Sequence, residues 1–259
     1  MTPEIIEETL LKLADIASDV TMPMFRAPLD IANKEEGGFD PVTLADKQAE
    51  AAIRKYINSN FPSHGIIGEE DGSTNKDAEY VWVIDPIDGT RAFISGLPGW
   101  GTLIGLTKNK KPIAGIMCQP FTKERYFTNG LTSTLLHEGK KTILKTSNVT
   151  ALSDATAMTT DPFIFAKEET PSFDLVRGQV KLMRYGFDCY AYAMVAAGNI
   201  DLVIESGLHI YDVSALIPIV ENAGGLFTNW QGEPVANGGQ VIAAANQELL
   251  NQAIELLNN

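Results

Sequence analysis

The stretch WVIDPIDGT, residues 82–90, is the most informative segment of the chain. It continues an apolar run that begins at Tyr80, and a short run of this kind is typical of a buried strand. Asp85 ends the run, Pro86 stiffens the turn, and Asp88 follows three residues after Asp85. The segment therefore predicts a strand that delivers two carboxylates into one rigid turn.

The residues after this turn have the pattern of a helix start. Gly89 and Thr90 lead into a short run through Phe93, and backbone N–H groups at an uncovered helix N-terminus attract anions. Paired carboxylates beside them can hold hard divalent cations. An ordinary strand-to-helix turn with Asp88 as its N-cap has the same pattern. The segment alone leaves both interpretations open.

Outward from this segment, helical and strand patterns alternate along the chain. We expect helices over 3–17, 45–57, 189–197, 212–222 and 247–257, and strands over 80–84, 102–108, 112–118, 125–127, 181–185, 200–204 and 241–244. This interleaving, with an antiparallel block in the middle, predicts layered α/β or α+β packing. No repeat or linker divides the sequence. We therefore expect one compact unit over 1–259, with halves over about 1–145 and 146–259.

The chain is strongly acidic. Its 259 residues include 33 Asp and Glu against 20 Lys and Arg, a net charge of −13. This charge argues against nucleic acid or an anionic membrane surface as a partner, and it suits metal ions and cationic ligands. An apolar fraction of 44% excludes a disordered chain.

Cysteine usage and the N-terminus bear on the compartment. Cys118 and Cys189 lie far apart and form no disulfide framework, which fits a reducing compartment. No apolar run approaches membrane length, and the acidic start MTPEIIEETL is unlike a signal peptide. We expect a soluble, cytoplasmic protein.

Further acids lie where predicted elements begin or end. Glu69 belongs to the acidic run GEEDG at 68–72, Asp46 lies at the start of a predicted helix, and Asp212 precedes another. Each has an ordinary explanation: a solvated loop, a first-turn acid favoured by the helix dipole, and an N-cap. Together these explanations do not account for so many acids at the ends of elements.

Four motifs give the chain a family resemblance. They are PVTLAD at 41–46, GEE at 68–70, DPIDGT at 85–90, and YDVSA with ENAGG between 211 and 225. In this order they resemble motifs of the inositol monophosphatase family, whose members are magnesium-dependent, lithium-sensitive phosphomonoesterases. The resemblance covers nearly the whole chain. It implies a layered αβαβα sandwich, of the type shared with fructose-1,6-bisphosphatase, and a homodimer.

The resemblance also implies two to three Mg²⁺ ions per site. The implied ligands of the activating ion are Glu69, Asp85 and the backbone carbonyl of Ile87. Those of a second ion, on the leaving-group side, are Asp85, Asp88 and Asp212. A third and weaker ion would be bound by Asp46 through water. We expect residues 33–41, which are polar and rich in glycine, to form a mobile flap that brings Asp46 to the site.

Further roles concern the phosphate and the attacking water. The resemblance implies that the N–H groups of Gly89 and Thr90 bind phosphate oxygens, and that Glu69 and the Thr90 hydroxyl orient the water. The physical logic agrees, because a phosphate ester and hydroxide are both anions and a metal ion brings them together. No GxSxG elbow or P-loop is present. His64, His137 and His209 lack zinc-ligand spacing and are interpreted as structural.

Three local features bear on the substrate. Arg91 follows the DPIDGT motif, TTDP occupies 159–162, and RYGFDCYAY occupies 184–192. All three resemble the histidinol-phosphate phosphatases of this family, although Phe187 replaces a commoner glycine. Asp188 stands where inositol phosphatases usually carry a small apolar residue.

Charge gives an independent reason for the same substrate. If the fold is as implied, Asp188 and Glu205 lie beside the leaving group, and Arg91 also binds substrate. Two carboxylates suit histidinol, which carries an ammonium and a titratable imidazole. Asp188 could also be the N-cap of the helix over 189–197.

The sequence therefore predicts hydrolysis of L-histidinol phosphate to L-histidinol and phosphate, a step of histidine biosynthesis. An inositol-1-monophosphatase or a broad sugar and polyol monophosphatase is the alternative within the family. An inactive dimeric interaction protein is the alternative from another class, and the intact set of site acids argues against it.

Overall fold

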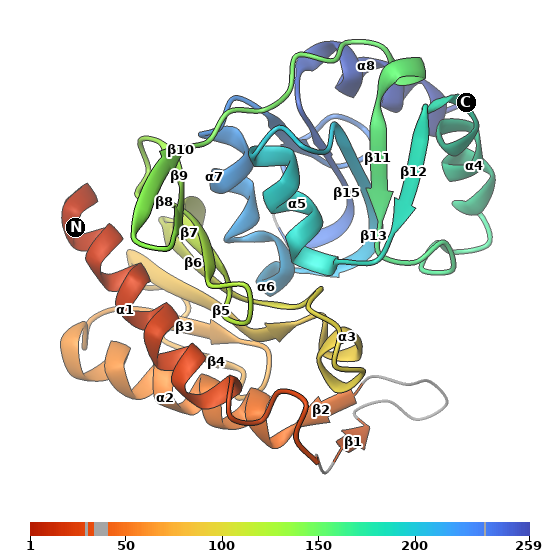
Figure 1. Cartoon of the computed structure of the whole chain (residues 1–259). Coiled ribbons are helices and arrows are strands. Elements are labelled where there is room, and N and C mark those ends of the chain that lie inside the picture. Colours follow the sequence, from red (N-terminus) through yellow and green to blue (C-terminus); the bar gives the residue numbers. More distant parts are fainter. Residues whose placement is uncertain (29–30, 34–40, 236) are drawn as a thin grey trace.

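The larger sheet has eight strands in the order β10-β9-β8-β7-β6-β5-β3-β4 (Figure 1). The computed structural model describes residues 1–28, 31–33, 41–235 and 237–259. The strands are β3 (Gly65–Gly68), β4 (Ser73–Thr74), β5 (Tyr80–Asp88), β6 (Gly101–Lys108), β7 (Lys111–Gln119), β8 (Glu124–Thr128), β9 (Ser133–His137) and β10 (Lys140–Ile143). Only β3 and β5 pair in parallel, with Gly68 opposite Ile84. Residues that follow these two strands therefore meet at one edge of the sheet.

Helices α1 (Pro3–Thr21) and α2 (Leu44–Asn60) cover one face of this sheet (Figure 1). Thr2 caps α1 and Thr43 caps α2, each accepting a backbone N–H. The buried face of the pair includes Ile6, Leu10, Leu13, Ile53 and Ile57, which pack with Trp82, Ile84, Ile104 and Ile116 of the sheet. In a separate apolar cluster, Ala45 at the start of α2 packs with Ile87 near the end of β5.

The smaller sheet has five strands in the order β12-β11-β13-β15-β14. They are β11 (Thr156–Thr159), β12 (Leu182–Tyr185), β13 (Leu202–His209), β14 (Leu226–Thr228) and β15 (Gly238–Ala244). The pairing of β13 with β15 shifts register between Glu205 and Leu208. Helices α4 (Thr170–Gln179) and α8 (Gln247–Leu257) cover its outer face through apolar contacts that include Phe173 and Leu249.

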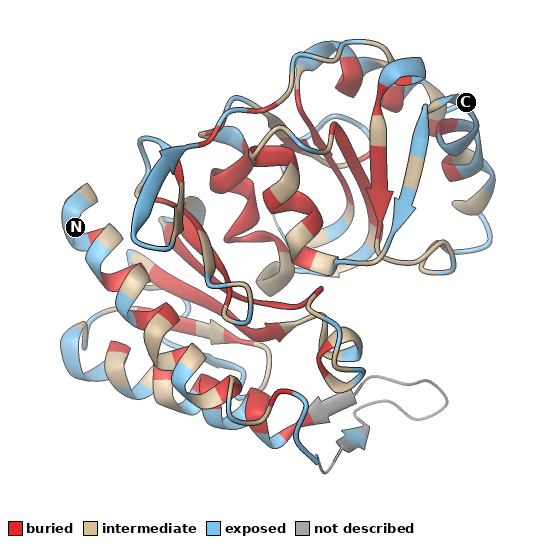
Figure 2. Cartoon of the chain, viewed as in Figure 1, coloured by how far each residue is buried: buried red, intermediate tan, exposed pale blue. Residues whose placement is uncertain are grey.

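Three helices fill the space between the two sheets (Figure 1). They are α5 (Asp188–Ala196), α6 (Ile210–Val213) and α7 (Leu216–Glu221). One buried cluster joins Leu103 and Met117 of the large sheet to Val195 and Val220 of the helices and to Val203 of the small sheet, and Figure 2 shows much of this layer as buried. The layers alternate as αβαβα, which confirms the predicted fold class.

Most expected elements are present, several with extended ends, but others were missed. The sequence analysis did not predict β3, β4, β9, β10, β11, β14 and α4. All four residues of β10 are exposed, so the strand has no apolar alternation. Only Phe173 and Val176 of α4 are buried, which leaves a weak helical pattern. The remaining short elements are the paired strands β1 (Ile31–Asn33) and β2 (Pro41–Thr43), helix α3 (Thr90–Ile94) and a 3₁₀ turn at Leu152–Asp154.

The single helix expected over 212–222 is wrong. The chain forms α6, which ends at Val213, and starts α7 at Leu216. Ser214 and Ala215 between them keep right-handed helical dihedrals, so the interruption lies in the hydrogen-bond pattern. Pro218 is the reason, because it has no N–H to donate to the carbonyl of Ser214 and its ring clashes with a continuous helix. In the first turn of α7, where no donor is required, the same proline is tolerated.

Some expectations are not decided by this fold. Of the predicted flap over 33–41, residues 34–40 lie outside the described residues. The strands of the large sheet fall within 65–143 and those of the small sheet within 156–244, and the division into halves near residue 145 stays a prediction. Among the described residues, no helix combines the length and apolar character needed to cross a membrane.

Candidate active site

The parallel pairing of β3 and β5 brings Glu69 next to Asp85. Glu69 follows β3, and its N–H donates to the carbonyl of Ile84 at 3.2 Å. Asp85 is buried at 2% exposure, and its Oδ1 accepts the N–H of Ile87 at 3.0 Å. The turn is held further by the Thr102 hydroxyl, which donates to the carbonyl of Pro86 at 2.8 Å.

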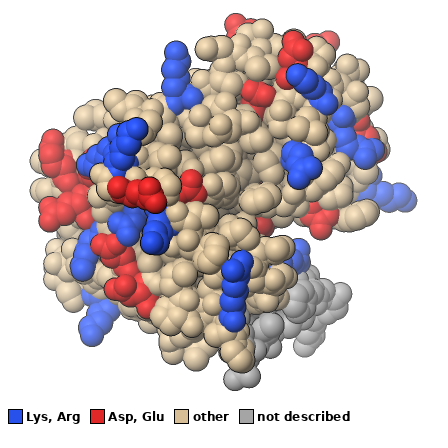
Figure 3. All heavy atoms as spheres, in the orientation of Figure 1, with Lys and Arg blue, Asp and Glu red and all other residues tan. Residues whose placement is uncertain are grey.

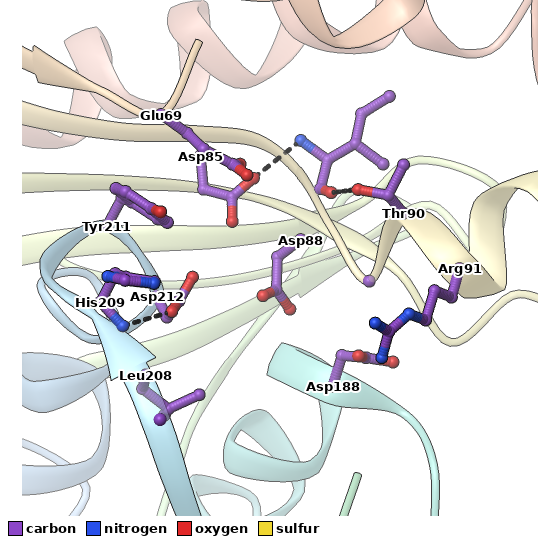
Figure 4. Close-up of a pocket in the computed structure, with 13 residues that line it drawn as sticks. Glu69, Asp85, Asp88, Thr90, Arg91, Asp188, Leu208, His209, Tyr211 and Asp212 are labelled. Atoms are coloured by element: carbon purple, nitrogen blue, oxygen red, sulfur yellow. Dashed lines mark hydrogen bonds between the residues drawn. The ribbon is translucent and has the colours of Figure 1, made fainter. Parts of the chain in front are cut away.

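Two more carboxylates close the cluster from other parts of the chain. Asp88 ends β5, and its Oδ2 accepts the N–H of Cys189 at 2.6 Å. Asp212 lies in α6, where its Oδ2 accepts the N–H of His209 at 2.6 Å. Carboxylate oxygens of Asp85, Asp88 and Asp212 all lie within 4.8 Å of one another, and the three side chains point into one space (Figure 4).

The cluster opens into two adjoining cavities. The first cavity, of about 490 Å³, is lined by Glu69, Asp85, Ile87, Asp88, Gly89, Thr90, Arg91, Asp188, Gly207, Leu208, His209, Tyr211 and Asp212. The second cavity, of about 750 Å³, shares Asp88, Arg91, Asp188 and Asp212 with the first and adds Thr160, Asp161, Phe163, Tyr192 and Glu205 among its walls. Acids from both sheets therefore lie around one hollow. On the face of the molecule in Figure 3, acidic and basic side chains are interspersed.

Ionising these acids together is costly. Burial, followed by repulsion from Glu69 and Asp88, raises the pKa of Asp85 well above its ordinary value. Burial raises the pKa of Asp88 to about 6. Burial and the neighbouring Asp88 raise the pKa of Asp212 well above its ordinary value. A divalent cation would remove the repulsion, and clustered carboxylate oxygens are the ligands that Mg²⁺ prefers.

Asp46 contributes a further free ligand atom. It lies in the first turn of α2, where its Oδ2 accepts both the N–H and the hydroxyl of Thr43, at 2.8 and 2.6 Å. Its Oδ1 is buried and has no hydrogen-bond partner, and burial raises the pKa of the carboxyl. The first-turn explanation of Asp46 is confirmed. The unpartnered oxygen, which desolvation would otherwise penalise, also fits a cation or its water shell, although Asp46 is not among the residues that line either cavity.

Gly89 and Thr90 shape the turn after β5. Gly89 caps α3 (Thr90–Ile94) with a φ of 81°, a conformation that favours glycine. A Cβ at this position would lie 3.0 Å from Cγ of Asp188. The Thr90 hydroxyl donates to the carbonyl of Ile87 at 3.0 Å. The N-cap explanation of Asp88 is wrong, since Gly89 occupies that position.

Asp188 and Glu205 both line the second cavity, and their place beside a leaving group stays a prediction. Asp188 is the first residue of α5, not its N-cap, which is Phe187 with a φ of 77°. A left-handed φ of this kind favours glycine, so Phe187 occupies a conformation that side chains rarely adopt. Burial, then Asp88 and Glu205, raise the pKa of Asp188 well above its ordinary value, and Arg91 opposes the rise. Figure 4 shows the Arg91 and Asp188 side chains side by side.

Glu205 is a buried member of the small sheet. Its oxygens accept the Tyr192 hydroxyl and the N–H of Thr160, each at 2.7 Å. Burial raises its pKa. Because Tyr192 belongs to α5 and Thr160 follows β11, this carboxylate ties three elements together on the wall of the second cavity.

Sequence reasoning missed several residues of the two cavities. His209 lines the first cavity, and its ring stacks on Tyr211 at 5.2 Å between centroids. It is also the N-cap of α6, so the interpretation of His209 as structural is not contradicted. Its place three residues before Asp212 was the available signal. Phe163, which is 90% exposed, lines the second cavity. His64 is structural as interpreted, since its Nδ1 accepts the Trp82 indole N–H at 3.1 Å.

Similarity to known proteins agrees with the fold and the acid cluster. Residues 3–259 match the inositol monophosphatase family. The chain belongs to this family. It is 44% identical, over 257 residues, to the chloroplastic bifunctional phosphatase IMPL2 of Arabidopsis thaliana, covering 95% of this chain and 72% of that protein. It is 34% identical to the histidinol-phosphatase of Streptomyces coelicolor, covering 95% and 94%.

A solved structure is similar over almost the same length. An inositol monophosphatase from Zymomonas mobilis has a TM-score of 0.87 at 40% identity, with 99% of this chain and 98% of that chain covered. The relatives therefore share fold and phosphatase class but carry different substrate names. The chain is an inositol monophosphatase-family phosphatase, and its substrate has to be inferred from its own cavity.

The raised pKa values predict how the stability of the metal-free protein depends on pH. The pKa of Asp88 is about 6 in the folded chain against an ordinary value of 3.8. The folded state holds the proton more tightly, so stability falls as pH rises from about 4 through 6. For Asp88 alone the loss is about 2 to 3 kcal/mol. Thermal unfolding in EDTA should give a lower Tm at pH 7.5 than at pH 5.5, and Mg²⁺ should restore it.

The matched variant for this prediction is Asp88→Asn, which keeps an oxygen for the Cys189 N–H but carries no charge. Without metal it should unfold at a higher temperature than the wild type at pH 7.5, and the two should converge near pH 4. If the Tm of the metal-free wild type changed with pH in the same way as the Tm of Asp88→Asn, the repulsion at Asp88 would not be the cause of the pH dependence.

Proposed function

We propose that this protein is a Mg²⁺-dependent phosphomonoesterase that hydrolyses L-histidinol phosphate to L-histidinol and phosphate. The observation that carries the proposal is the junction of the two cavities. The Asp85, Asp88 and Asp212 cluster, suited to metal, opens directly onto a second hollow with Asp188 and Glu205 on its walls. A phosphate at the junction would have its leaving group among the second pair of acids.

The metal-binding roles follow the family pattern. We assign Glu69, Asp85 and the Ile87 carbonyl to the activating ion. We assign Asp85, Asp88 and Asp212 to a second ion. Asp46 binds a third ion through water. Bound Mg²⁺ supplies positive charge that lowers the pKa of water and neutralises the leaving oxygen. Inhibition by lithium belongs to the same proposal, since it would compete for these oxygen ligands.

Thr90 and Glu69 orient the attacking water. The single hydroxyl proton of Thr90 is committed to the Ile87 carbonyl at 3.0 Å. Its oxygen lone pairs are therefore available to accept a hydrogen bond from water. Glu69, on the Asp85 side of the first cavity, is the second acceptor. Two acceptors in fixed positions direct the remaining lone pair of the water toward phosphorus.

The turn at Gly89 suits the phosphate. Its left-handed backbone, and the absence of a Cβ, let the chain approach a bound anion closely at the start of α3. We assign the N–H groups of Gly89 and Thr90 to two phosphate oxygens. The phosphate would then lie between these donors and the metal ligands.

The leaving group of the proposed substrate fits the second cavity by charge and shape. The ammonium and imidazole of histidinol offer donors to Asp188 and Glu205. Arg91 partly offsets the rise in the pKa of Asp188 beside the other acids, and it can bind the phosphate side of the substrate. Phe163 presents an exposed aromatic ring on the same wall, a surface for a flat ring to stack on.

Relatives support this substrate and one alternative. Histidinol-phosphatases are among the relatives aligned over nearly their full length. Hydrolysis of inositol phosphates is the second candidate, because a structure 40% identical is an inositol monophosphatase. A bifunctional phosphatase is also among the relatives, so overlap of substrates is consistent with the family. The homodimer implied by the resemblance stays a prediction, which light scattering of the purified protein would check.

A substrate panel tests the proposal. With purified protein and saturating Mg²⁺, kcat/KM for L-histidinol phosphate should exceed that for myo-inositol 1-phosphate and glycerol 2-phosphate by about tenfold or more, the size of one charge-assisted hydrogen bond. Faster turnover of myo-inositol 1-phosphate would reject the histidinol assignment in favour of the second candidate.

Asp188→Asn should separate binding of the cation from the chemistry. The variant removes the charge and keeps the shape, so kcat/KM for L-histidinol phosphate should fall about tenfold to a hundredfold. Turnover of glycerol 2-phosphate, which has no cationic group, should change by less than about threefold. Equal losses on both substrates would show that Asp188 acts only through the structure of the turn at Gly89.

Asp88→Asn tests the metal chemistry itself. Release of phosphate should require Mg²⁺ in the wild type and fall by at least about a hundredfold in the variant, because a cluster ligand is lost. Circular dichroism should confirm that the variant is folded. Full activity in the variant, or wild-type activity that persists in EDTA, would overturn the metal mechanism. No activity in a metal-loaded wild type would favour the interaction-protein alternative.

A further inference from the structure

A buried carboxylate lies outside both cavities, directly behind Glu69. Glu50, in α2, is 0% exposed. Its Oε2 accepts the N–H of Glu70 at 2.8 Å, and its Oε1 accepts the N–H of Asp71 at 3.0 Å. The Nε of Arg54 also donates to Oε1, at 2.7 Å. Such burial is costly for a carboxylate unless charge and hydrogen bonds compensate for it, as they do here.

These contacts fix the peptide planes on both sides of Glu69. The N–H of Glu70 belongs to the planar unit that contains the carbonyl of Glu69, and Glu50 holds that N–H. The preceding peptide is held by the bond from the Glu69 N–H to the Ile84 carbonyl, at 3.2 Å. With both planes anchored, the direction in which the Glu69 side chain leaves the backbone is set.

Two further features show that the loop is shaped around this carboxylate. A Cβ on Gly68 would lie 2.1 Å from Oε1 and 2.4 Å from Cδ of Glu50, so only glycine lets the carboxylate pack against the chain here. Arg54 also donates to the carbonyl of Gly72, and the N–H of Gly68 donates to the same carbonyl at 2.9 Å. The turn over 68–72 is thereby closed around the Glu50–Arg54 pair.

We propose that Glu50 is a positioning residue for Glu69. It sets the orientation of the Glu69 carboxylate toward Asp85 and thereby the affinity of the site for its activating divalent cation. Its ion pair with Arg54 balances its charge, so its effect on the site is through geometry. This inference rests on the proposed function, because it assumes that Glu69 is a metal ligand and orients water.

Glu50→Gln is the primary test, since it keeps the shape but leaves one loop N–H and Arg54 without their acceptor. The affinity of the substrate-free protein for Mg²⁺ and Mn²⁺, measured by isothermal titration calorimetry, should fall about tenfold or more. The Mg²⁺ concentration for half-maximal phosphatase activity should rise by a similar factor. KM for the phosphate ester at saturating Mg²⁺ should change by less than about threefold, because Glu50 is remote from the ester.

Asp201→Asn is the matched control. Asp201 is also a buried carboxylate, 6% exposed, and it accepts the N–H of Thr156 at 2.7 Å and the Ser147 hydroxyl. Its loss should lower Tm and leave Mg²⁺ affinity unchanged. Gly68→Ala is the second variant, because its Cβ would displace the Glu50 carboxylate. It should weaken Mg²⁺ binding as Glu50→Gln does, and the double variant should be little worse than either.

Hydrogen exchange gives a readout without metal. The amides of Glu70 and Asp71 should lose protection in Glu50→Gln, while those of β5 keep it. A folded Glu50→Gln with wild-type Mg²⁺ affinity would overturn the inference while the proposed function stands. If Glu50→Gln does not fold, unchanged Mg²⁺ affinity in Gly68→Ala would overturn it. A wild type that neither binds Mg²⁺ nor releases phosphate would overturn both.

Discussion

Repulsion among carboxylates is the constraint on which the rest of this structure depends. Oxygens of Asp85, Asp88 and Asp212 lie within 4.8 Å of one another, and the pKa of each is raised. Left to itself, a chain relieves such repulsion by moving the acids apart or into water. Each of these three is instead held by a backbone N–H, donated by Ile87, Cys189 and His209 respectively. The fold therefore holds carboxylates that repel one another in one place, and a bound cation would offset that repulsion.

The holding elements come from both sheets, which is why the site needs the whole fold. The parallel pair of β3 and β5 aligns Glu69 with Asp85, while α5 and α6, packed between the sheets, bring Cys189 and Asp212. The register shift in β13 falls between Glu205 and Leu208, where the strand passes the cavities. A substitution in either apolar layer would shift these elements and so change the distances among the acids without contacting any of them.

The proposed function assigns chemistry and specificity to adjoining parts of the site. In it, the cluster and the turn at Gly89 carry the chemistry, and the second cavity receives the leaving group. Two acids of that cavity, Asp188 and Glu205, interact with Arg91, Tyr192 and Thr160. Under this proposal, a family with one fold could change substrate at the second cavity while the cluster is kept.

The amino-acid sequence by itself determined the family and the acids that line the site, because motifs such as DPIDGT are local and a strand followed by a turn carries its own pattern. The αβαβα layers were implied by that family resemblance, while the residue patterns alone predicted only layered α/β or α+β packing. It did not determine β10, whose residues are all exposed, or the break at Pro218, which ended a helix predicted from apolar spacing. Only the tertiary structure brought His209 and Phe163 to the cavities and set Glu50 behind Glu69. Those contacts join residues that are distant along the chain or on separate elements, and no local pattern specifies which of them meet.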